Sequence, residues 1–136
     1  VMDQMGCPTS AWDIAEAMIT VAAELLKGRT DAYGVYNCAG LGAVSWHGFA
    51  VEIFKQAAVY GHPMPRLEAI PTAAYPTPAQ RPKNSRLNCH RIAAAYGVAA
   101  KPWQRSLEQC LGMMLLPPGT ASAKAGVEAS LLNVRS

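Results

Sequence analysis

The sequence has 136 residues, which is about the size of one domain and enough to bury a hydrophobic core. Hydrophobic residues make up 51% and charged residues only 15%, which is low in charge for a freestanding soluble domain and indicates that some apolar surface meets a partner or another part of the same protein. The net charge of +3 is too small to indicate a nucleic-acid-binding protein, and the basic residues lack the interleaved aromatics of a single-strand binder.

The cysteines and histidines form no recognisable metal or disulfide pattern. The four cysteines are far apart in the sequence and the three histidines are scattered, which favours a reduced, cytoplasmic chain. Asp3 follows two apolar residues with no basic leader, so no signal peptide is expected, and the apolar run near residues 112–116 is too short to span a bilayer. We expect no membrane and no nucleic-acid partner. The chain opens on Val1 in the middle of a motif, which suggests a fragment.

The first predicted helix covers residues 11–27. Ser10, with Asp13 three residues later, forms a capping pattern, and Gly28 is a natural stop. Six apolar residues recur at helical spacing and predict the buried face: Ile14, Ala15, Met18, Val21, Ala22 and Leu25. The residues expected on the opposite, solvated side are Asp13, Glu16, Thr20, Glu24 and Lys27.

A short strand is predicted at residues 34–38, which contain β-formers bounded by glycine. Gly40-x-Gly42-x-x-Ser45 follows, at the position of a dinucleotide-binding turn. The third glycine is replaced by serine, and no acidic residue ends a following strand about 20 residues further on. Ser45 as the cap of the next helix explains the segment better.

Three more helices and a second strand are predicted further along. A helix at residues 46–60 ends at Gly61, with a buried stripe of Trp46, Phe49, Ala50, Ile53, Phe54 and Ala57. Residues 67–70 predict a strand, and Asn88 caps a third helix that ends at Gly97. Pro102 suits the first turn of a fourth helix, whose shared face contains Trp103, Leu107, Cys110, Leu111 and Met114.

The loop at residues 76–87 combines prolines with cations. Its prolines keep the backbone extended, and its basic residues are Arg81, Lys83 and Arg86. No Asp or Glu occurs from residue 69 to residue 107. A stiff loop with unpaired cations suits a phosphate or carboxylate, because arginine offers both a planar fork of donors. The alternative is a solvated connection whose charges serve solubility.

Alternating strands and helices predict an α/β fold with a small sheet and about four helices. So small a sheet is more plausible as part of a larger protein than as a complete doubly wound domain. We divide the chain into residues 1–116, a binding portion, and residues 117–136, an Ala/Ser/Gly-rich tail expected to be weakly ordered. No serine or cysteine with a histidine and no carboxylate pair forms a catalytic set, so no catalytic residue is assigned.

The order of five motifs carries a family resemblance: Asp3-Gln4-x-Gly6-x-Pro8-Thr9, Gly34-Val35-Tyr36-Asn37-x-Ala39-Gly40, Ser45-Trp46-x-x-Phe49-Ala50, Tyr75-Pro76-Thr77-Pro78-Ala79-x-Arg81-Pro82-x-Asn84-Ser85-x-Leu87 and Pro102-Trp103. Together they resemble the C-terminal, sugar-nucleotide-binding portion of the dTDP-4-dehydrorhamnose reductases, a family of extended short-chain dehydrogenases. The resemblance covers about residues 3–107, and the chain after Glu108 departs from the family.

The resemblance implies a reductase that passes hydride from NADPH, or NADH, to the 4-keto group of dTDP-4-dehydro-L-rhamnose. The product, dTDP-L-rhamnose, serves bacterial surface polysaccharides. In that family the cofactor fingerprint and the Tyr-x-x-x-Lys catalytic set lie in an N-terminal Rossmann part. No tyrosine here is followed four residues later by lysine, so we expect the chain alone to be inactive and to need its own N-terminal Rossmann part as a partner.

The resemblance also implies the binding site. Residues 4–9 and 81–86 would flank a cleft for the dTDP-sugar substrate. Arg81 and Arg86 are assigned to the diphosphate, Asn84 and Ser85 to polar contacts, and Pro82 to loop stiffness. The expected substrate-binding residues are Gln4, Pro8, Thr9, Arg81, Pro82, Asn84, Ser85 and Arg86.

Alternatives stay open at this point. Arg86 could simply be exposed, and Asn84 with Ser85 could only shape a turn. Some members of the family bridge a homodimer with a divalent metal through glutamates, and we map no such ligand onto this chain. A non-catalytic, reductase-like regulatory subunit is the alternative function, and an inactive gene remnant is a third class.

Overall fold

The structure is a computed structural model that describes residues 1–29 and 31–116. In this part of the chain four α-helices accompany a two-stranded sheet: α1 (Ala11–Leu26), α2 (Trp46–Ala57), α3 (His90–Tyr96), α4 (Trp103–Leu115), β1 (Met5–Gly6) and β2 (Val44–Ser45). Two short 3-10 helices occur at Ala58–Tyr60 and Thr72–Ala74. The expected small α/β arrangement with about four helices is confirmed. The expected tail at residues 117–136 lies outside the described residues.

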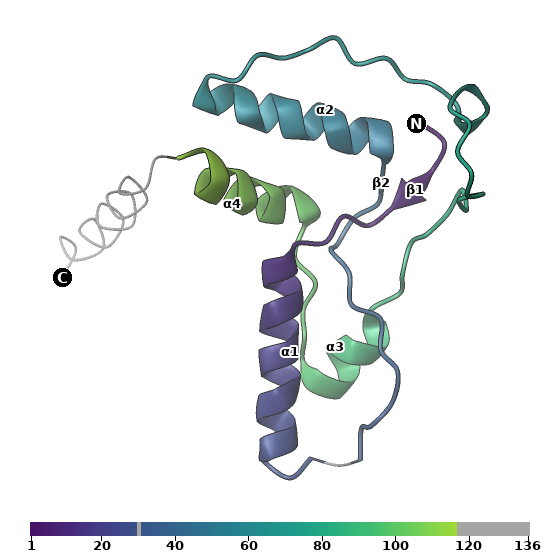
Figure 1. The fold of residues 1–136 in the computed structure, drawn as a ribbon. Coiled ribbons are helices and arrows are strands. Elements are labelled where there is room, and N and C mark those ends of the chain that lie inside the picture. The colour runs from purple at the N-terminus through teal and green to yellow at the C-terminus, as the bar shows by residue number, and fades with distance from the viewer. Residues whose placement is uncertain (30, 117–136) are drawn as a thin grey trace, which may run out of the picture.

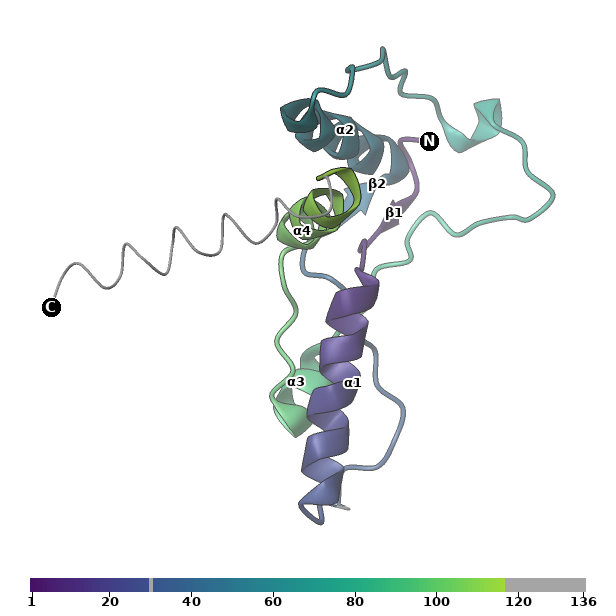
Figure 2. The ribbon, with the colours of Figure 1, turned by 60° about the vertical axis from the view of Figure 1, so that its left-hand side comes forward.

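The helices form two pairs that meet at the sheet. In Figures 1 and 2, α2 lies along α4 at one end of the molecule, and α1 lies beside α3 at the other. The long loop between α2 and α3 runs around the outside and passes close to the N-terminus (Figure 1). None of the described helices is long and apolar enough to cross a bilayer.

Serine caps and glycine stops explain where the helices begin and end. Ser10 accepts a hydrogen bond from the Trp12 N–H at 3.1 Å, and Ser45 accepts one from the Gly48 N–H at 3.1 Å. Gly97 ends α3 in the left-handed conformation that glycine adopts without strain. The capping roles predicted for both serines are confirmed.

The third and fourth helices start slightly differently from the prediction. Asn88 accepts a hydrogen bond from the N–H of His90 at 2.9 Å, but Cys89 is the residue that directly precedes α3. Pro102 stands immediately before α4 and not within its first turn.

The predicted strands at residues 34–38 and 67–70 were wrong for this structure, since neither segment lies in a sheet. The two strands that form are the opening segment and the residues just before α2, paired antiparallel with Met5 opposite Ser45 and Gly6 opposite Val44. A strand needs a neighbour for its backbone N–H and C=O groups. Local composition says nothing about which neighbour is available.

The core is small and divided between the two helix pairs. Trp103 meets Phe49 edge to face at a centroid distance of 5.6 Å. The buried apolar residues are Ala17, Ala39, Ala57, Ile92, Tyr96, Trp103 and Leu111. Five residues predicted to be buried are exposed instead: Ala15, Met18, Ala22, Trp46 and Met114.

The buried face of helix α1 overlaps only in part with the predicted one, since Ile14, Val21 and Leu25 are partly buried while the other predicted residues are exposed. Ala17 is its buried residue, and the side chain of Asp13, expected in solvent, is only 12% exposed. Ala15 and Ala22 are exposed. The helix is apolar on more than one side, so the sequence pattern could not select the side that α3 contacts.

Candidate substrate-binding site

The opening segment (residues 1–9) lies between β2 and the basic loop (residues 76–87). The structure therefore brings the two predicted binding segments, residues 4–9 and 81–86, together. Met5 donates its N–H to the Lys83 carbonyl at 2.8 Å, and its own carbonyl accepts the Ser85 N–H at 2.9 Å. The Ser85 hydroxyl donates to that same carbonyl at 3.1 Å. On the other side, Met5 pairs with Ser45 of β2. Two segments about 80 residues apart in sequence are thus joined through one residue.

A pocket of about 450 Å³ opens where these segments meet. Its lining residues come from the opening segment, the start of α2 and the basic loop: Gln4, Gly6, Cys7, Pro8, Thr9, Val44, Ser45, Trp46, Phe49 and Ser85. Four predicted binding residues lie in this wall, namely Gln4, Pro8, Thr9 and Ser85. The pocket has the size and the mixed polarity of a small-molecule site.

Gln4 lies deep in the wall and is tied to a neighbouring loop. Its side chain is 7% exposed, and Nε2 donates to Oγ1 of Thr72 at 3.1 Å. Thr72 in turn donates its hydroxyl and its N–H to Oδ1 of Asp3, at 2.7 and 2.8 Å. The hydroxyl bond from Thr72 is the main cause that lowers the pKa of Asp3. This hydrogen-bond network fixes the side chain of Gln4 in the pocket wall.

Pro8 and Thr9 are fixed against the segment that precedes β2. The Thr9 hydroxyl donates to the Cys7 carbonyl at 2.9 Å and accepts the Gly40 N–H at 3.0 Å. A Cβ at Gly40 would lie 2.2 Å from the Pro8 carbonyl oxygen. The first glycine of the Gly-x-Gly segment therefore serves close backbone packing. The protein's own chain fills the space that a phosphate would need, so these residues do not fit a dinucleotide cofactor.

The basic loop presents its cations outside this pocket. Arg81, Pro82, Asn84 and Arg86 are exposed and do not line the 450 Å³ pocket. Within the described part of the chain neither arginine forms an ion pair. Asn84 Oδ1 accepts from both the backbone N–H and Nε of Arg86, at 3.1 and 2.9 Å. The terminal nitrogens of Arg86 stay available to an anion.

Arg86 borders a second hollow of about 500 Å³, which also contains His90 and residues 39–43 in its wall. Cys7 contributes to both this hollow and the 450 Å³ pocket. The two spaces therefore lie on either side of one residue. An elongated ligand with an anionic centre could reach from the apolar wall at α2 to the arginine.

Sequence reasoning missed the aromatic part of the pocket. Trp46 was placed in the buried stripe of α2, yet it is 59% exposed and stands beside Phe49 in the pocket wall. As the first residue of α2, directly after its cap, Trp46 precedes the helix positions that pack on α4. Its position directly after the Ser45 cap was the feature of the sequence that could have indicated exposure of Trp46.

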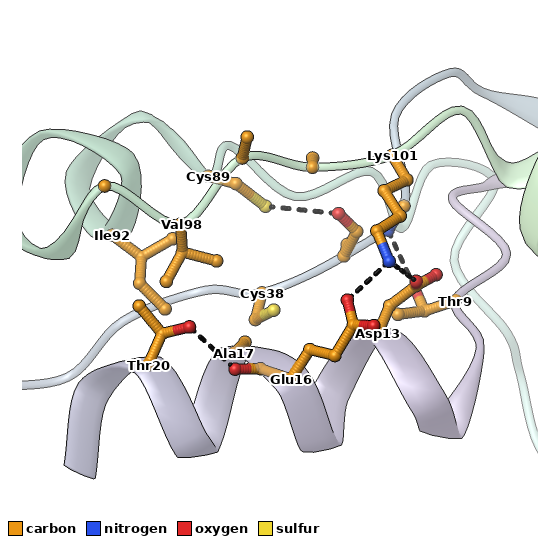
Figure 3. A pocket seen from close by; sticks show the side chains of 15 residues that line it. Thr9, Asp13, Glu16, Ala17, Thr20, Cys38, Cys89, Ile92, Val98 and Lys101 are labelled. Carbon is orange, nitrogen blue, oxygen red and sulfur yellow. Dashed lines mark hydrogen bonds and ion pairs between the residues drawn. The ribbon is translucent and has the colours of Figure 1, made fainter. Parts of the chain in front are cut away.

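A third, smaller pocket of about 150 Å³ lies between α1 and the chain that leads into α4 (Figure 3). Lys101 reaches Asp13 at 3.4 Å and also contacts Glu16, and the Ser106 hydroxyl donates to Asp13 at 2.6 Å. Burial is the main cause that raises the pKa of Cys38 in this pocket, which argues against a reactive thiolate. We assign the cluster to holding α1 against α4.

Metal-binding side chains do not gather anywhere in residues 1–29 and 31–116. No three residues of the types His, Cys, Asp and Glu are grouped closely enough to hold a metal ion there.

Comparisons with known proteins point to one family. The model of the RmlD substrate binding domain matches residues 1–115. A dTDP-4-dehydrorhamnose reductase of Aggregatibacter actinomycetemcomitans is 42% identical over 110 residues, which cover 79% of this chain and 37% of that protein. One from Sinorhizobium fredii is 37% identical over 117 residues, which cover 85% of this chain and 40% of that protein.

Solved structures give the same result. A crystal structure of a dTDP-4-dehydrorhamnose reductase from Clostridium acetobutylicum has a TM-score of 0.74 and 31% identity, covering 85% of this chain and 38% of that one. One from Bacillus anthracis, in complex with NADP, has a TM-score of 0.59 and 27% identity, covering 79% of this chain and 35% of that one. This chain spans about two fifths of the length of the curated relatives it matches. The chain belongs to the RmlD substrate binding domain family.

Proposed function

We propose that this chain is the C-terminal, substrate-binding portion of an NAD(P)H-dependent reductase that converts dTDP-4-dehydro-L-rhamnose to dTDP-L-rhamnose for surface polysaccharide. The observation that carries the proposal is the pairing of Met5 with both β2 and the basic loop. It sets a partly apolar pocket beside a loop that carries two arginines without ion pairs among the described residues, and one of them, Arg86, borders the adjoining hollow. The names of the relatives supply the substrate class.

Each part of the site has a separate task in binding. Arg81 and Arg86 neutralise the diphosphate, and Asn84 holds Arg86 in place through Nε. Ser85 and Thr9 supply polar contacts near the sugar, and Pro82 limits the freedom of the loop. Trp46 and Phe49 form the apolar wall. The cofactor, when bound, supplies the hydride, and the relative crystallised with NADP supports NADPH for the parent enzyme.

The catalytic groups belong, in this proposal, to an N-terminal Rossmann part of the same enzyme. Tyr-x-x-x-Lys is absent from the 136 residues, and the Gly40 turn is filled by Pro8. The chain alone would therefore bind substrate without turning it over.

A hybrid reductase tests the proposal. In this hybrid, the present chain replaces the matched stretch of the Aggregatibacter enzyme, with which it is 42% identical. We expect NADPH-dependent reduction of dTDP-4-dehydro-L-rhamnose by the hybrid and none by the chain alone. Turnover by the isolated chain would contradict the assignment of the catalytic groups to the N-terminal part. A folded hybrid that binds no dTDP-sugar but captures an intact reductase in a pull-down would favour a regulatory subunit instead.

A further inference from the structure

Two cysteines that are far apart in the sequence come together in the structure. Cys38 and Cys89 both line the pocket of about 150 Å³, and Figure 3 shows both side chains there, with Cys38 next to α1. Hydrogen bonds join the two segments on either side of Cys38. The Asn37 amide donates to the Asn88 carbonyl at 3.3 Å, and the Cys89 thiol donates to the Ala39 carbonyl at 3.9 Å. Both chain neighbours of Cys38 therefore contact the segment that carries Cys89.

The two thiols differ in how readily they react. Both are half-buried. Burial is the first cause that raises the pKa of Cys38, and the neighbouring Cys89 is the second. A thiol with a raised pKa is a poor first attacker, because the thiolate is the reacting form. Cys38 therefore suits the second step of a thiol exchange, in which it only has to reach a sulfur beside it.

Cys89 can also be reached from a second side. It lines the hollow of about 500 Å³ together with Arg86, and no Asp or Glu of the described chain contributes to that wall. The smaller pocket instead holds two carboxylates against one cation, at Asp13, Glu16 and Lys101. A small anionic reagent is therefore drawn to Cys89 from the hollow and not through the smaller pocket.

We propose that Cys38 and Cys89 are a redox-active dithiol, which anionic low-molecular-weight disulfides such as glutathione disulfide oxidise to an internal disulfide. Cys89 attacks one sulfur of the reagent, forms a mixed disulfide and releases one thiolate. Cys38 then attacks the sulfur of Cys89, which forms the internal disulfide and releases the second thiolate. The two protons of the cysteine thiols end on the two released thiolates, and two electrons pass from the dithiol to the reagent. The dithiol is independent of the proposed function.

The position of Cys89 allows the disulfide to close. A disulfide brings the two β-carbons to about 4 Å from each other. Cys89 directly precedes α3, a helix of 7 residues, and it follows the exposed residues 81–88. The movement therefore falls on the end of the basic loop, which packs against little, and the segment around Cys38 can stay in place. The disulfide would tether this end of the loop, close to Arg86.

Peptide mapping tests the proposal. The full chain is incubated with glutathione disulfide without denaturant, its remaining thiols are blocked, and its peptides are analysed without reductant. We expect a peptide pair linked through Cys38 and Cys89, with the mass of two hydrogens lost, while Cys7 and Cys110 are recovered as blocked thiols. Linkage through Cys7 or Cys110 in equal yield, or no linkage, would overturn the proposal. The same distribution of linkages in urea would show that the folded structure does not select the pair.

Two alanine variants separate the steps. Cys38→Ala should stop at the mixed disulfide, with one glutathione on Cys89, because the second thiol is missing. Cys110→Ala, the matched control, should form the internal disulfide like the native chain. Cys89→Ala provides an independent test that does not need Cys38→Ala to fold, since it should leave Cys38 unmodified. Glutathione on Cys38 in that variant would contradict the order of attack.

The charge of the hollow is tested with a second reagent. Arg86→Gln should slow the reaction with glutathione disulfide by about threefold or more, and it should not slow the reaction with cystamine, a cationic disulfide. Lys83→Gln removes the same charge from an exposed residue of the loop that does not line the hollow, and it should change the rate less. Equal slowing by both variants, or equal slowing with both reagents, would contradict entry beside Arg86.

Discussion

At the scale of single residues, Gly40 is the glycine at which a side chain would fit least well. A Cβ there would lie 2.2 Å from the Pro8 carbonyl oxygen, and backbone atoms cannot move aside as a flexible side chain can. Gly40 also donates its N–H to Thr9. Gly40 therefore fixes the positions of Pro8 and Thr9, which both line the 450 Å³ pocket.

Gly40→Ala should destabilise the protein by about 1–3 kcal/mol, the range expected for overpacking, and should weaken dTDP-sugar binding because Pro8 and Thr9 shift. Gly112→Ala is the control, since its Cβ would meet only the Tyr60 hydroxyl, at 3.3 Å, and alanine favours the helix. Urea denaturation of the hybrid reductase measures both. Equal losses would show that the Pro8 contact does not matter.

Asp3 makes stability depend on pH in the acid range. Its pKa is lowered from 3.8, chiefly by the Thr72 hydroxyl bond, so its contribution is fully present above about pH 4 and is lost as the pH falls through the lowered value. Asp3→Asn should therefore lose less stability than the native chain between about pH 6 and about pH 3. Glu68→Gln, which removes an exposed carboxylate, should keep the native pH dependence. Melting temperatures at the two pH values decide the matter.

At the scale of elements, the helix caps and most of the buried faces of α2 and α4 were predicted correctly, and the buried face of α1 only in part. Ser10, Ser45 and Gly97 act locally, and each was placed correctly because a cap or stop depends on its own few neighbours. The buried face of α1 depends on what lies beside it, and the sequence offered two apolar faces. The strand at residues 34–38 was predicted from composition, but its pairing needs a partner that the described chain does not supply.

Asp13 illustrates the same limit within α1. Expected in solvent, it accepts the hydroxyl of Ser106, which is 4% exposed, at 2.6 Å. Asp13→Ala should cost about 1–3 kcal/mol, because it leaves that hydroxyl without its partner. Glu16→Ala removes the other carboxylate on Lys101, is 61% exposed, and should cost less than about 1 kcal/mol. Urea denaturation of the two hybrids should show this order, and the reverse order would contradict the role given to Asp13.

The candidate site was predictable only in part, because motifs can be read from the sequence while the burial of a side chain depends on its neighbours in space. The opening motif and the basic loop were expected to flank one cleft, and Met5 does join them. Trp46 was missed because an apolar helix residue suggests burial, while its position at the start of α2 leaves it at the pocket.

At the scale of the whole molecule, the small core limits what the isolated chain can do. No side chain in the described residues is buried beyond 98%, and besides the opening segment and the sheet the two helix pairs are joined by few contacts, such as the hydrogen bond from Ser106 of α4 to Asp13 of α1. A single cooperative transition is typical of a small domain that has a complete core of its own. Circular dichroism should show a broad, weakly cooperative melt for the isolated chain and a sharp one for the hybrid reductase. A sharp melt of the isolated chain would mean that it is a self-sufficient domain.

The central claim is that this chain holds the diphosphate of a nucleotide sugar with Arg81 and Arg86. Calorimetric titration of the hybrid reductase with dTDP-rhamnose tests it most directly. Arg81→Gln with Arg86→Gln should weaken binding about a hundredfold or more, since each charge-assisted bond contributes about 1.5–3 kcal/mol. Lys55→Gln with Arg66→Gln, which removes the same charge elsewhere on the surface, should change affinity less than about threefold. Unchanged affinity in the first pair would contradict the account.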